Sequence, residues 1–497
     1  MDFTATYAHV HGACIAFSPG STFLAYVAGK SRRTVHVRVS GTLDIVRSWE
    51  LDDALDALEW SKDGLFLLVS AYSRNASDTD TGVSYVLPLD PDAAVTDGSD
   101  DGRGWVARIA AGVQGLRRAM WLPVWRLPSI IQFSQYETSA LVVSPADQSF
   151  TQVTGTLLPD VYGNSQWPDY FAVTQRERGR DYLALYAPRT PDAPTLDAPV
   201  VWDCMRSMPL ATNEVAGVAW SPDGNYLAVW DTFLEYRVCL YTLGGTHVAT
   251  LTLDDAGRPV VAAPLSSDEC SRAIEPSRQP RRVLTHTQRS APSWKRGAGT
   301  LLGVCHVTWH PSSEFLAVGG FDERVCVLTA EDWTVAYTLD YTTASLRRAA
   351  ADVWQEPEGW FEATQGQGIV GMELVTEKIY MPAHSESDSS SMPRVGISWL
   401  EWNHDGTLLA CRNAALPTLV FVHEFRGLLE RRVDACLAPL AILVLSAPVL
   451  SVAWKPGNAS TLAIATGHRA VYTWSQSNTG VQSADAIAVP NGAWFEA

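Results

Sequence analysis

The stretch GVAWSPDGNYLAV, residues 217–229, contains two short apolar runs separated by a polar turn. The turn is Ser-Pro-Asp-Gly, and its proline and glycine favour the backbone angles of a tight hairpin. Short runs of this kind on either side of a turn signal are typical of β-strands. The stretch therefore predicts two adjacent antiparallel strands.

The same pattern recurs along the chain, which indicates a repeat architecture. Each copy reads aliphatic-x-aromatic, then a polar turn, then an aromatic residue or leucine before a second apolar run. The closer copies are IAFSPGSTFLAYV (15–27), LEWSKDGLFLLVS (58–70), VTWHPSSEFLAVGG (307–320), LEWNHDGTLLACR (400–412) and VAWKPGNASTLAIATG (452–467). Two weaker copies are AMWLPVWRLPSII (119–131), which lacks the glycine turn, and WPDYFAVTQ (167–175), which keeps only the second half.

A third strand follows each copy, as in RVCLYTL and RVCVLTA, and a fourth usually comes after it, as in WTVAYTL. Four strands in about 40–45 residues form one blade of a β-propeller. We therefore predict an all-β, WD40-type β-propeller of about eight four-stranded blades. One ring over residues 1–497 is the preferred arrangement, although two partial rings would give the same count. The aromatic residues of the first strands are expected to fill the core between blades; they are Phe17, Trp60, Trp121, Trp220, Trp309, Trp402 and Trp454.

Trp230 and Asp231 form a Trp-Asp pair at an unusual place, after the second strand of a repeat rather than the third. When YLAVWDTFLEYRVCLYTL is aligned with FLAVGGFDERVCVLTA, the pair occupies the position of Gly319 and Gly320, and its hairpin is two residues longer. Trp and Tyr dominate protein-binding hot spots. We therefore predict a partner site at Trp230, Asp231, Glu235 and Tyr236. The alternative is that Trp230 packs into the groove between blades.

Three segments interrupt the repeats. Residues 90–104 are acidic, residues 254–302 are basic, and residues 341–394 combine an expected short helix at 343–354 with a serine-rich loop at 384–393. Loops that lengthen on one face of a rigid scaffold usually mark its binding side. The basic segment has the composition of a solvated, disordered loop. It is also a candidate contact for acidic partners, such as tubulin tails, or for RNA, through Arg278, Arg281, Arg282, Arg289, Lys295 and Arg296.

Composition excludes several classes of function. A net charge of −17 argues against general affinity for nucleic acid or anionic membranes, so we expect neither a DNA nor a membrane partner. The uncharged stretch 435–454 is interrupted by Pro439 and Pro448, and two buried strands explain it better than a membrane helix. The eight cysteines form no Cys-x-x-Cys pair and suit reduced, buried thiols in an intracellular protein.

No motif for catalysis stands in a context that would support it. Gly-x-Ser-x-Gly is absent, and GKS at 29–31 lacks the upstream glycine of a phosphate-binding loop. GQGIVG at 366–371 follows a polar stretch and precedes a strand-like one, so it does not fit a dinucleotide site. We therefore expect no enzyme activity, no catalytic residue, no cofactor and no metal, but a binding scaffold.

Three segments carry a resemblance to a known family: GVAWSPDGNYLAVWDTFLEYRVCLYTLGG, HVTWHPSSEFLAVGGFDERVCVLTAEDWTVAYTL and LEWSKDGLFLLVSAYSR. They resemble the WD-repeat family of spindle-pole and centrosomal proteins often called the Wdr-eight type. The chain looks like a fungal-like member, and LAVWD…LEY is its most recognisable stretch. The resemblance weakens in residues 90–165, and the basic segment looks like an addition to the family pattern.

The resemblance implies a non-catalytic adaptor in the cytoplasm and cytoskeleton, at the spindle pole body or another microtubule-organising centre such as the centrosome. Its implied partners are a coiled-coil microtubule-anchoring protein and, in fungi, a minus-end-directed kinesin. Together they would tether microtubule minus ends and support organisation of the mitotic spindle. The residues carried over as partner contacts are Trp230, Asp231, Glu235 and Tyr236.

The main alternative is a propeller scaffold in another assembly, such as an RNA- or ribosome-associated translation-initiation-type factor. Under that alternative, neutralising the basic residues at 278–296 abolishes RNA binding, and wild-type affinity falls steeply with salt because phosphate contacts release counterions. Filter binding of RNA at increasing salt concentration checks this expectation. Affinity that survives neutralisation would reject the alternative.

Overall fold

The computed structural model describes residues 14–73, 82–90, 107–123, 129–136, 138–145, 149–189, 201–254, 257–262, 303–341, 351–375, 396–425, 439–466, 470–477 and 479–488. These residues form two compact units that divide between Leu210 and Ala211. They contain eight sheets, and each sheet has at least four strands paired antiparallel in chain order. The predicted all-β, WD40-type blades, eight in number, are therefore confirmed.

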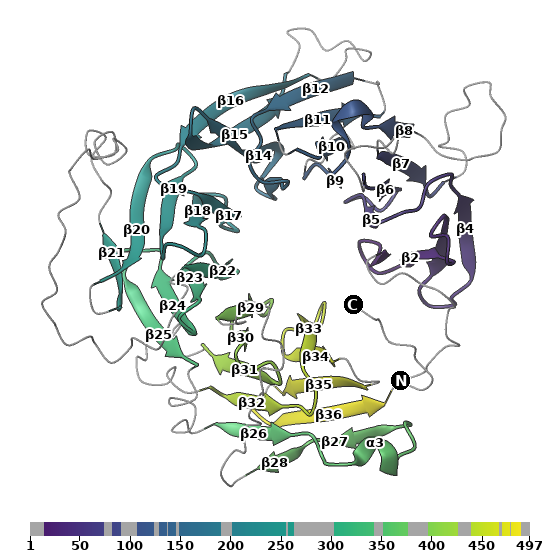
Figure 1. The fold of residues 1–497 in the computed structure, drawn as a ribbon. Helices are drawn as coiled ribbons and strands as arrows, with labels where there is room; N and C mark the ends of the chain where they lie inside the picture. Colours follow the sequence, from purple (N-terminus) through teal and green to yellow (C-terminus); the bar gives the residue numbers. More distant parts are fainter. Residues whose placement is uncertain are drawn as a thin grey trace, which may run out of the picture. The chain divides into compact units, whose positions relative to one another are not determined.

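The first unit contains blades 1 to 4 (Figure 1). Blade 1 consists of β1 (Ile15–Phe17), β2 (Phe23–Ala28), β3 (Thr34–Val39) and β4 (Ile45–Glu50). Blade 2 consists of β5 (Ala57–Trp60), β6 (Phe66–Ala71), β7 (Val83–Pro88) and β8 (Ala107–Ala110), followed by the 3-10 turn η2 (Gly112–Gln114). Blade 3 consists of β9 (Arg118–Trp121), β10 (Ile130–Phe133), β11 (Ser139–Ser144) and β12 (Ser149–Thr154). Blade 4 consists of β13 (Tyr162–Asn164), β14 (Trp167–Glu177), β15 (Arg180–Pro188) and β16 (Trp202–Pro209).

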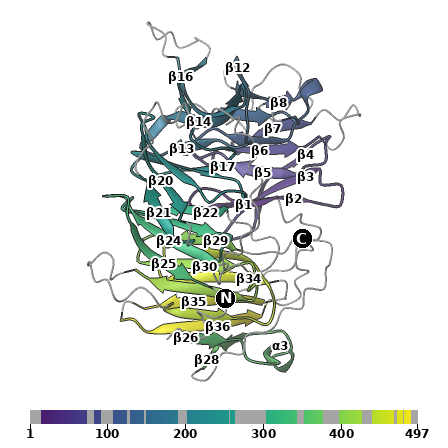
Figure 2. The ribbon, with the colours of Figure 1, turned by 60° about the vertical axis from the view of Figure 1, so that its left-hand side comes forward.

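The second unit contains blades 5 to 8 (Figures 1 and 2). Blade 5 consists of β17 (Val215–Trp220), β18 (Tyr226–Asp231), β19 (Val238–Thr242) and β20 (His247–Leu253). Blade 6 consists of β22 (Val304–Trp309), β23 (Phe315–Gly320), β24 (Arg324–Thr329) and β25 (Val335–Asp340). Blade 7 consists of β29 (Ile397–Trp402), β30 (Leu408–Asn413), β31 (Leu419–Glu424) and β32 (Ala441–Val444). Blade 8 consists of β33 (Val449–Trp454), β34 (Thr461–Thr466), β35 (Ala470–Gln476) and β36 (Gln482–Ala488).

In blades 1, 2, 5 and 7, the side chain of the residue that follows the aromatic one closes the polar turn. In blade 5, Tyr226 donates its backbone N–H to the Ser221 hydroxyl at 2.9 Å, and in blade 7 Leu408 donates to the Asn403 side chain at 2.9 Å. Gly224 has φ of 75°, in the left-handed region where a side chain is strained. The motif Ser-Pro-Asp-Gly is therefore a backbone requirement of this hairpin.

Tryptophans of the first strands connect neighbouring blades through one recurrent hydrogen bond. The indole N–H donates to the backbone carbonyl of the residue just before the corresponding aromatic residue in the preceding blade. The four pairs are Trp60 to Ala16 (3.1 Å), Trp121 to Glu59 (3.2 Å), Trp309 to Ala219 (3.1 Å) and Trp454 to Glu401 (3.3 Å). The repeat spacing thus sets which carbonyl each indole meets.

The expectation that these aromatic residues are core is correct for most of them. Trp60, Trp121, Trp309 and Trp402 are buried. It is wrong for Phe17, which is 59% exposed. Blade 1 begins its unit, so no preceding blade of that unit covers the ring.

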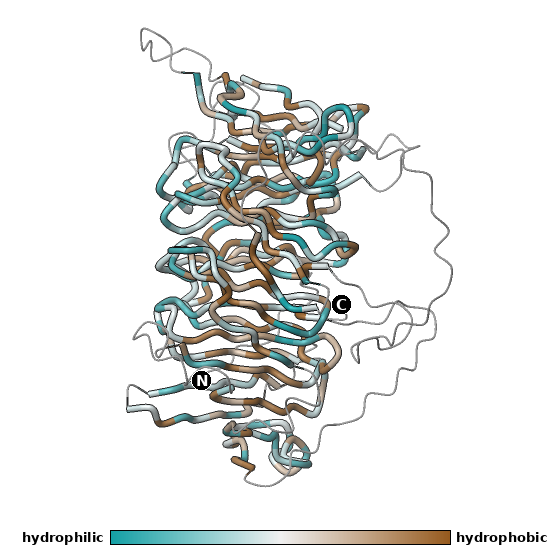
Figure 3. The backbone as a smooth tube through the Cα atoms, turned by 90° about the vertical axis from the view of Figure 1, so that its left-hand side faces the viewer, coloured by the Kyte–Doolittle hydropathy of each residue, from teal (hydrophilic) through white to brown (hydrophobic). Residues whose placement is uncertain are grey.

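Hydrophobic clusters fill the space between successive sheets, and Figure 3 shows the matching hydrophobic stretches along the strands. The cluster between blades 7 and 8 includes Val422, Leu443, Ile464 and Trp474. The stretch 435–454 contributes the buried strand β32 and the partly buried strand β33, which confirms the two-strand interpretation. Most free cysteines of the described residues are also buried, as expected: Cys14, Cys239, Cys326 and Cys411. The expectation is wrong for Cys204, which is exposed, and Cys305 is half-buried.

Parts of two predicted insertions form extra strands at sheet edges. β21 (Pro259–Ala262) lies within the basic segment and pairs with β20. β26 (Asp352–Gln355) pairs parallel with β32, and β28 (Glu373–Val375) pairs with β26. β27 (Ile369–Gly371) pairs with β36. In Figures 1 and 2, the strands β26, β27 and β28 and helix α3 (Trp360–Ala363) lie beside blades 7 and 8.

Two expectations for the insertions are therefore corrected. The expected helix at 343–354 is wrong at its end, because residues 352–354 belong to β26 and the described helix lies at 360–363. Pairing with the free edge of β32 outweighs local helix propensity there. The disorder expected throughout 254–302 is wrong for 259–262, for the same reason. The acidic loop after Asp90 and the serine-rich loop lie outside the described residues.

The hairpin between β14 and β15 of blade 4, with the sequence TQRERGRD, is an extension of these two strands. β14 and β15 stay paired as far as Glu177 and Arg180, and only Arg178 and Gly179 form the turn. Both have positive φ, of 52° and 79°, as a type I′ hairpin turn requires. This segment therefore projects as a stiff ribbon.

We expect Trp309→Phe to lower the free energy of unfolding by about 1 kcal/mol more than Trp402→Phe does. Both changes remove a similar ring, but only Trp309 has a hydrogen-bond acceptor for its indole N–H; that of Trp402 has no partner among the described residues. Urea unfolding of both variants checks this. Equal losses would mean that the indole hydrogen bond does not stabilise the contact between blades.

Candidate partner-binding site at the blade 5 hairpin

The Trp-Asp pair closes strand β18, and strand register confirms its predicted alignment. Trp230 lies opposite Gly217, as Gly319 lies opposite His306 in blade 6. Asp231 lies opposite Val215, as Gly320 lies opposite Val304. Both first strands have a register shift at the same place, so Ala216 and Cys305 are the extra, bulged residues.

The ring of Trp230 folds back over Gly217. A β-carbon at residue 217 would lie 2.2 Å from the Trp230 Cζ2 atom, so only glycine fits beneath the ring. Trp230 is half-buried and packs with residues that include Val304 of blade 6. One part of the Trp230 side chain therefore packs between blades 5 and 6, as in the alternative interpretation, and the rest lines an open pocket.

Asp231 is an internal anchor of the hairpin. The residue is 1% exposed, and Oδ1 accepts hydrogen bonds from the backbone N–H groups of Asn213 and Glu214, both at 2.8 Å. Arg237 approaches Oδ2 at 3.6 Å. Burial outweighs these contacts and raises the pKa of Asp231 to about 6. Asp231 fixes the loop before β17 to the end of β18, and it is not placed to touch a partner directly.

The other two predicted residues differ in exposure. Tyr236 is buried, and its ring lies against Gly320 of blade 6, where a β-carbon would be 2.8 Å from Tyr236 Cε2. Burial raises the pKa of Tyr236 well above its ordinary value. The side chain of Glu235 is 41% exposed and pairs with Arg237 at 2.7 Å. Among the four predicted residues, only Trp230 and Glu235 therefore present surface to a partner.

Sequence reasoning missed Phe233 and Leu234, which are 44% and 71% exposed at the tip of the hairpin. The sequence offered one signal for them: two apolar residues stand in a turn that is longer than the corresponding turn of blade 6. Below them the hairpin packs on the next blade: a β-carbon at Gly303 would lie 2.3 Å from the Phe233 Cα atom. Close backbone contact with blade 6 thus holds Phe233 and Leu234 outward.

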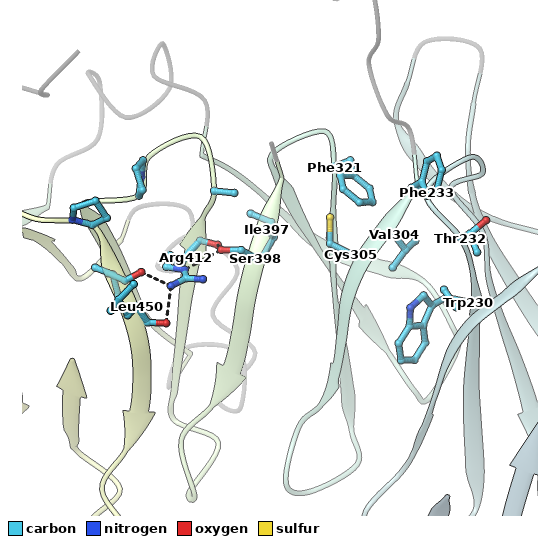
Figure 4. A pocket seen from close by; sticks show the side chains of 15 residues that line it. Trp230, Thr232, Phe233, Val304, Cys305, Phe321, Ile397, Ser398, Arg412 and Leu450 are labelled. Atoms are coloured by element: carbon cyan, nitrogen blue, oxygen red, sulfur yellow. Dashed lines mark hydrogen bonds between the residues drawn. The ribbon is translucent and has the colours of Figure 1, made fainter. Parts of the chain in front are cut away.

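A pocket of about 670 Å³ lies beside the hairpin and continues across blades 6, 7 and 8 (Figure 4). Its lining residues are Ala216, Trp230, Thr232, Phe233, Val304, Cys305, Phe321, Ile397, Ser398, Arg412, Ala414, Pro417, Pro448, Val449 and Leu450. Pockets of 300–1,000 Å³ with mostly apolar walls are typical binding sites. Arg412 was not among the sequence candidates, because nothing local distinguishes it from other arginines.

Three further expectations from the sequence concern a basic contact surface, a metal site and a membrane helix. The basic residues Arg278, Arg281, Arg282, Arg289, Lys295 and Arg296 lie outside the described part of the chain. Within the described residues, no three His, Cys, Asp or Glu side chains gather closely enough to hold a metal ion. The described helices include none that is long and apolar enough to cross a membrane.

We expect Asp231→Ala to lower the free energy of unfolding by about 2–4 kcal/mol, because two backbone N–H groups and Arg237 lose their acceptor in a buried place. Glu235→Ala, the control in the same hairpin, should cost less than about 1 kcal/mol, since its ion pair is exposed. Urea unfolding of both variants checks the difference. A loss for Asp231→Ala no larger than the control's would show that the hairpin does not depend on this carboxylate.

The chain is similar to several known proteins. The WD40 repeat model "WD domain, G-beta repeat" matches residues 298–327. Two solved structures resemble the fold: Sqt1 from Chaetomium thermophilum (TM-score 0.45, 13% identity, 86% of this chain and 82% of that one) and the C-terminal WD40 domain of Sif2 (TM-score 0.45, 10% identity, 98% and 100%). The WD repeat-containing protein WRAP73 of Mus musculus is 25% identical over 492 residues, covering 96% of this chain and 87% of the mouse protein. With its eight four-stranded sheets and recurrent repeat motif, the chain has the fold class of a WD40-type β-propeller.

Proposed function

We propose that this protein is a non-catalytic adaptor at the spindle pole body or centrosome. It binds a coiled-coil microtubule-anchoring protein and helps to tether microtubule minus ends during organisation of the mitotic spindle. The proposal is supported by the resemblance of the LAVWD…LEY stretch to spindle-pole WD-repeat proteins. The similarity to a mouse WD repeat-containing protein over 96% of the chain supports the WD-repeat scaffold that this role requires.

The observation that carries the adaptor role is the blade 5 hairpin. Its base is fixed by Asp231 and by the packing of Trp230 on Gly217, whereas its tip exposes Phe233 and Leu234. Leu450, 52% exposed, adds a further large apolar side chain to the neighbouring pocket. Apolar side chains held outward on a rigid support are the usual composition of a protein-binding patch.

A minus-end-directed kinesin is the second partner of this proposal, recruited together with the anchoring protein. The protein then acts in the cytoskeleton, at a microtubule-organising centre. The role requires no catalytic group, because a scaffold contributes geometry: it holds two partners close enough for each to raise the effective concentration of the other.

The test is affinity purification from mitotic cells with wild type, Leu234→Asp and the control Val113→Asp. Leu234 is 71% exposed and Val113 is 100% exposed on the other unit, so both variants should fold. We expect a coiled-coil spindle-pole protein and a kinesin with wild type and with the control. Recovery with Leu234→Asp should fall by about tenfold or more, as for loss of an interface hot spot.

The outcomes separate the function from the site. Equal recovery with Leu234→Asp would keep the adaptor role and remove the hairpin from its interface. Ribosomal or RNA-processing proteins in place of the spindle-pole proteins would contradict the adaptor proposal. They would instead favour the RNA-associated alternative, with residues 278–296 as its contact.

A further inference from the structure

The pocket beside the blade 5 hairpin has an unusual balance of charge. Among its 15 lining residues, all within the described part of the chain, Arg412 is the single charged one, and none is a carboxylate. The whole chain has 54 acidic residues against 37 basic ones. A cation that meets no acidic side chain among these lining residues, in a chain with an excess of acidic residues, indicates a binding site for one negatively charged group.

Within the described residues, the contacts of Arg412 leave its charge without a counter-ion. Nε donates to the Ser398 hydroxyl at 2.9 Å, and Nη1 donates to the carbonyls of Val449 and Leu450 at 2.5 and 3.2 Å. Among the described residues it forms no ion pair, and Nη2 makes no hydrogen bond. Partial desolvation of this half-buried group lowers the pKa of Arg412. These contacts orient the guanidinium, and a carboxylate could accept bonds from it with the geometry that arginine favours.

The opposite end of the pocket is aromatic. Figure 4 shows Trp230 and Phe233 at one side and Arg412 with Leu450 at the other, with Val304, Cys305 and Ile397 between them. An occupant that satisfies both ends must therefore be elongated. It needs an apolar side chain for the aromatic end and an anion at Arg412.

We propose that this pocket binds an extended segment of a partner protein that places one large apolar side chain against Trp230 and Phe233 and one Asp or Glu side chain on Arg412. The inference rests on the adaptor role proposed above and states the chemistry of the segment that such a partner would present. A nucleic acid strand fits less well, because its regularly spaced phosphates would meet one cation and otherwise apolar walls.

The experiment uses the purified full chain and a phage-displayed library of random peptides. Enriched sequences are synthesised with amidated C-termini, so that any essential carboxylate belongs to an Asp or Glu side chain. Binding of a fluorescein-labelled peptide is then measured by fluorescence polarisation. We expect enriched peptides to share an acidic residue and an apolar one, and replacement of the acidic residue by its amide to weaken binding about tenfold or more.

Matched variants distinguish the effect of removing the Arg412 charge from the effect of a folding defect. Arg412→Gln should weaken binding about tenfold or more, whereas Arg412→Lys, which keeps the charge, should lose less. Phe233→Ala should also weaken binding. The controls neutralise or truncate exposed residues of the other unit: Arg178→Gln, at a side chain 91% exposed, and Phe150→Ala, 72% exposed.

Arg412 also donates hydrogen bonds to the carbonyls of Val449 and Leu450, so its replacement changes the local structure as well as the charge. A further variant therefore blocks the pocket and leaves Arg412 unchanged. Ala216 is exposed at the bulge of β17 and lines the pocket, so Ala216→Trp fills the space without disturbing the core. It should abolish peptide binding while the circular dichroism spectrum and thermal unfolding stay as in wild type.

Several results would overturn the inference: no enriched peptide, enriched peptides that need no carboxylate, or binding that tolerates both Arg412→Gln and Ala216→Trp. Self-association of the chain that Arg412→Gln abolishes would make a second copy the occupant and would also overturn it. The selection contains no cellular partner. It can therefore fail while the spindle-pole proteins still co-purify with wild type, and it can succeed when they do not.

Discussion

The hydrogen bond from a first-strand tryptophan to a carbonyl of the preceding blade is the contact on which the arrangement within each unit depends. Trp60, Trp121, Trp309 and Trp454 all make it with the same relative register. A large ring sets the distance between two sheets, and its N–H fixes how far one sheet slides along the other. Because each acceptor is a backbone atom, the contact survives variation in the residue that supplies it.

Blade 7 shows what replaces this contact where it is missing. The Trp402 indole N–H has no acceptor among the described residues, and His310 of blade 6 lies edge-on to its ring with centroids 4.8 Å apart. His310 also bonds through Nε2 to the Gly406 carbonyl, at 2.9 Å, in the turn of blade 7. A β-carbon at Gly406 would lie 2.0 Å from that nitrogen, so the turn glycine also provides space for the imidazole.

The candidate site follows from this rigid stacking of blades 5 to 8. The pocket walls come from the ends of strands that the blade contacts hold in place, and the blade 5 hairpin adds aromatic residues at one end. Asp231 and Gly217 have supporting roles: one ties the hairpin base, the other makes room for Trp230. Buried hydrogen bonds beneath an exposed tip allow recognition with little loss of conformational entropy.

The sequence by itself determined the strands and turns of the repeats and the number of blades, because tight turns and apolar alternation are local properties that repeat in the chain. It also determined the alignment of Trp230 and Asp231 with Gly319 and Gly320. Tertiary structure alone decided that Asp231 and Tyr236 are internal, since neighbouring segments bury them. It decided that residues 352–354 join a sheet edge rather than a helix, and that Arg412 shares a pocket with Trp230. These outcomes depend on which surfaces meet after folding, and no local pattern records contacts between residues so far apart in the chain.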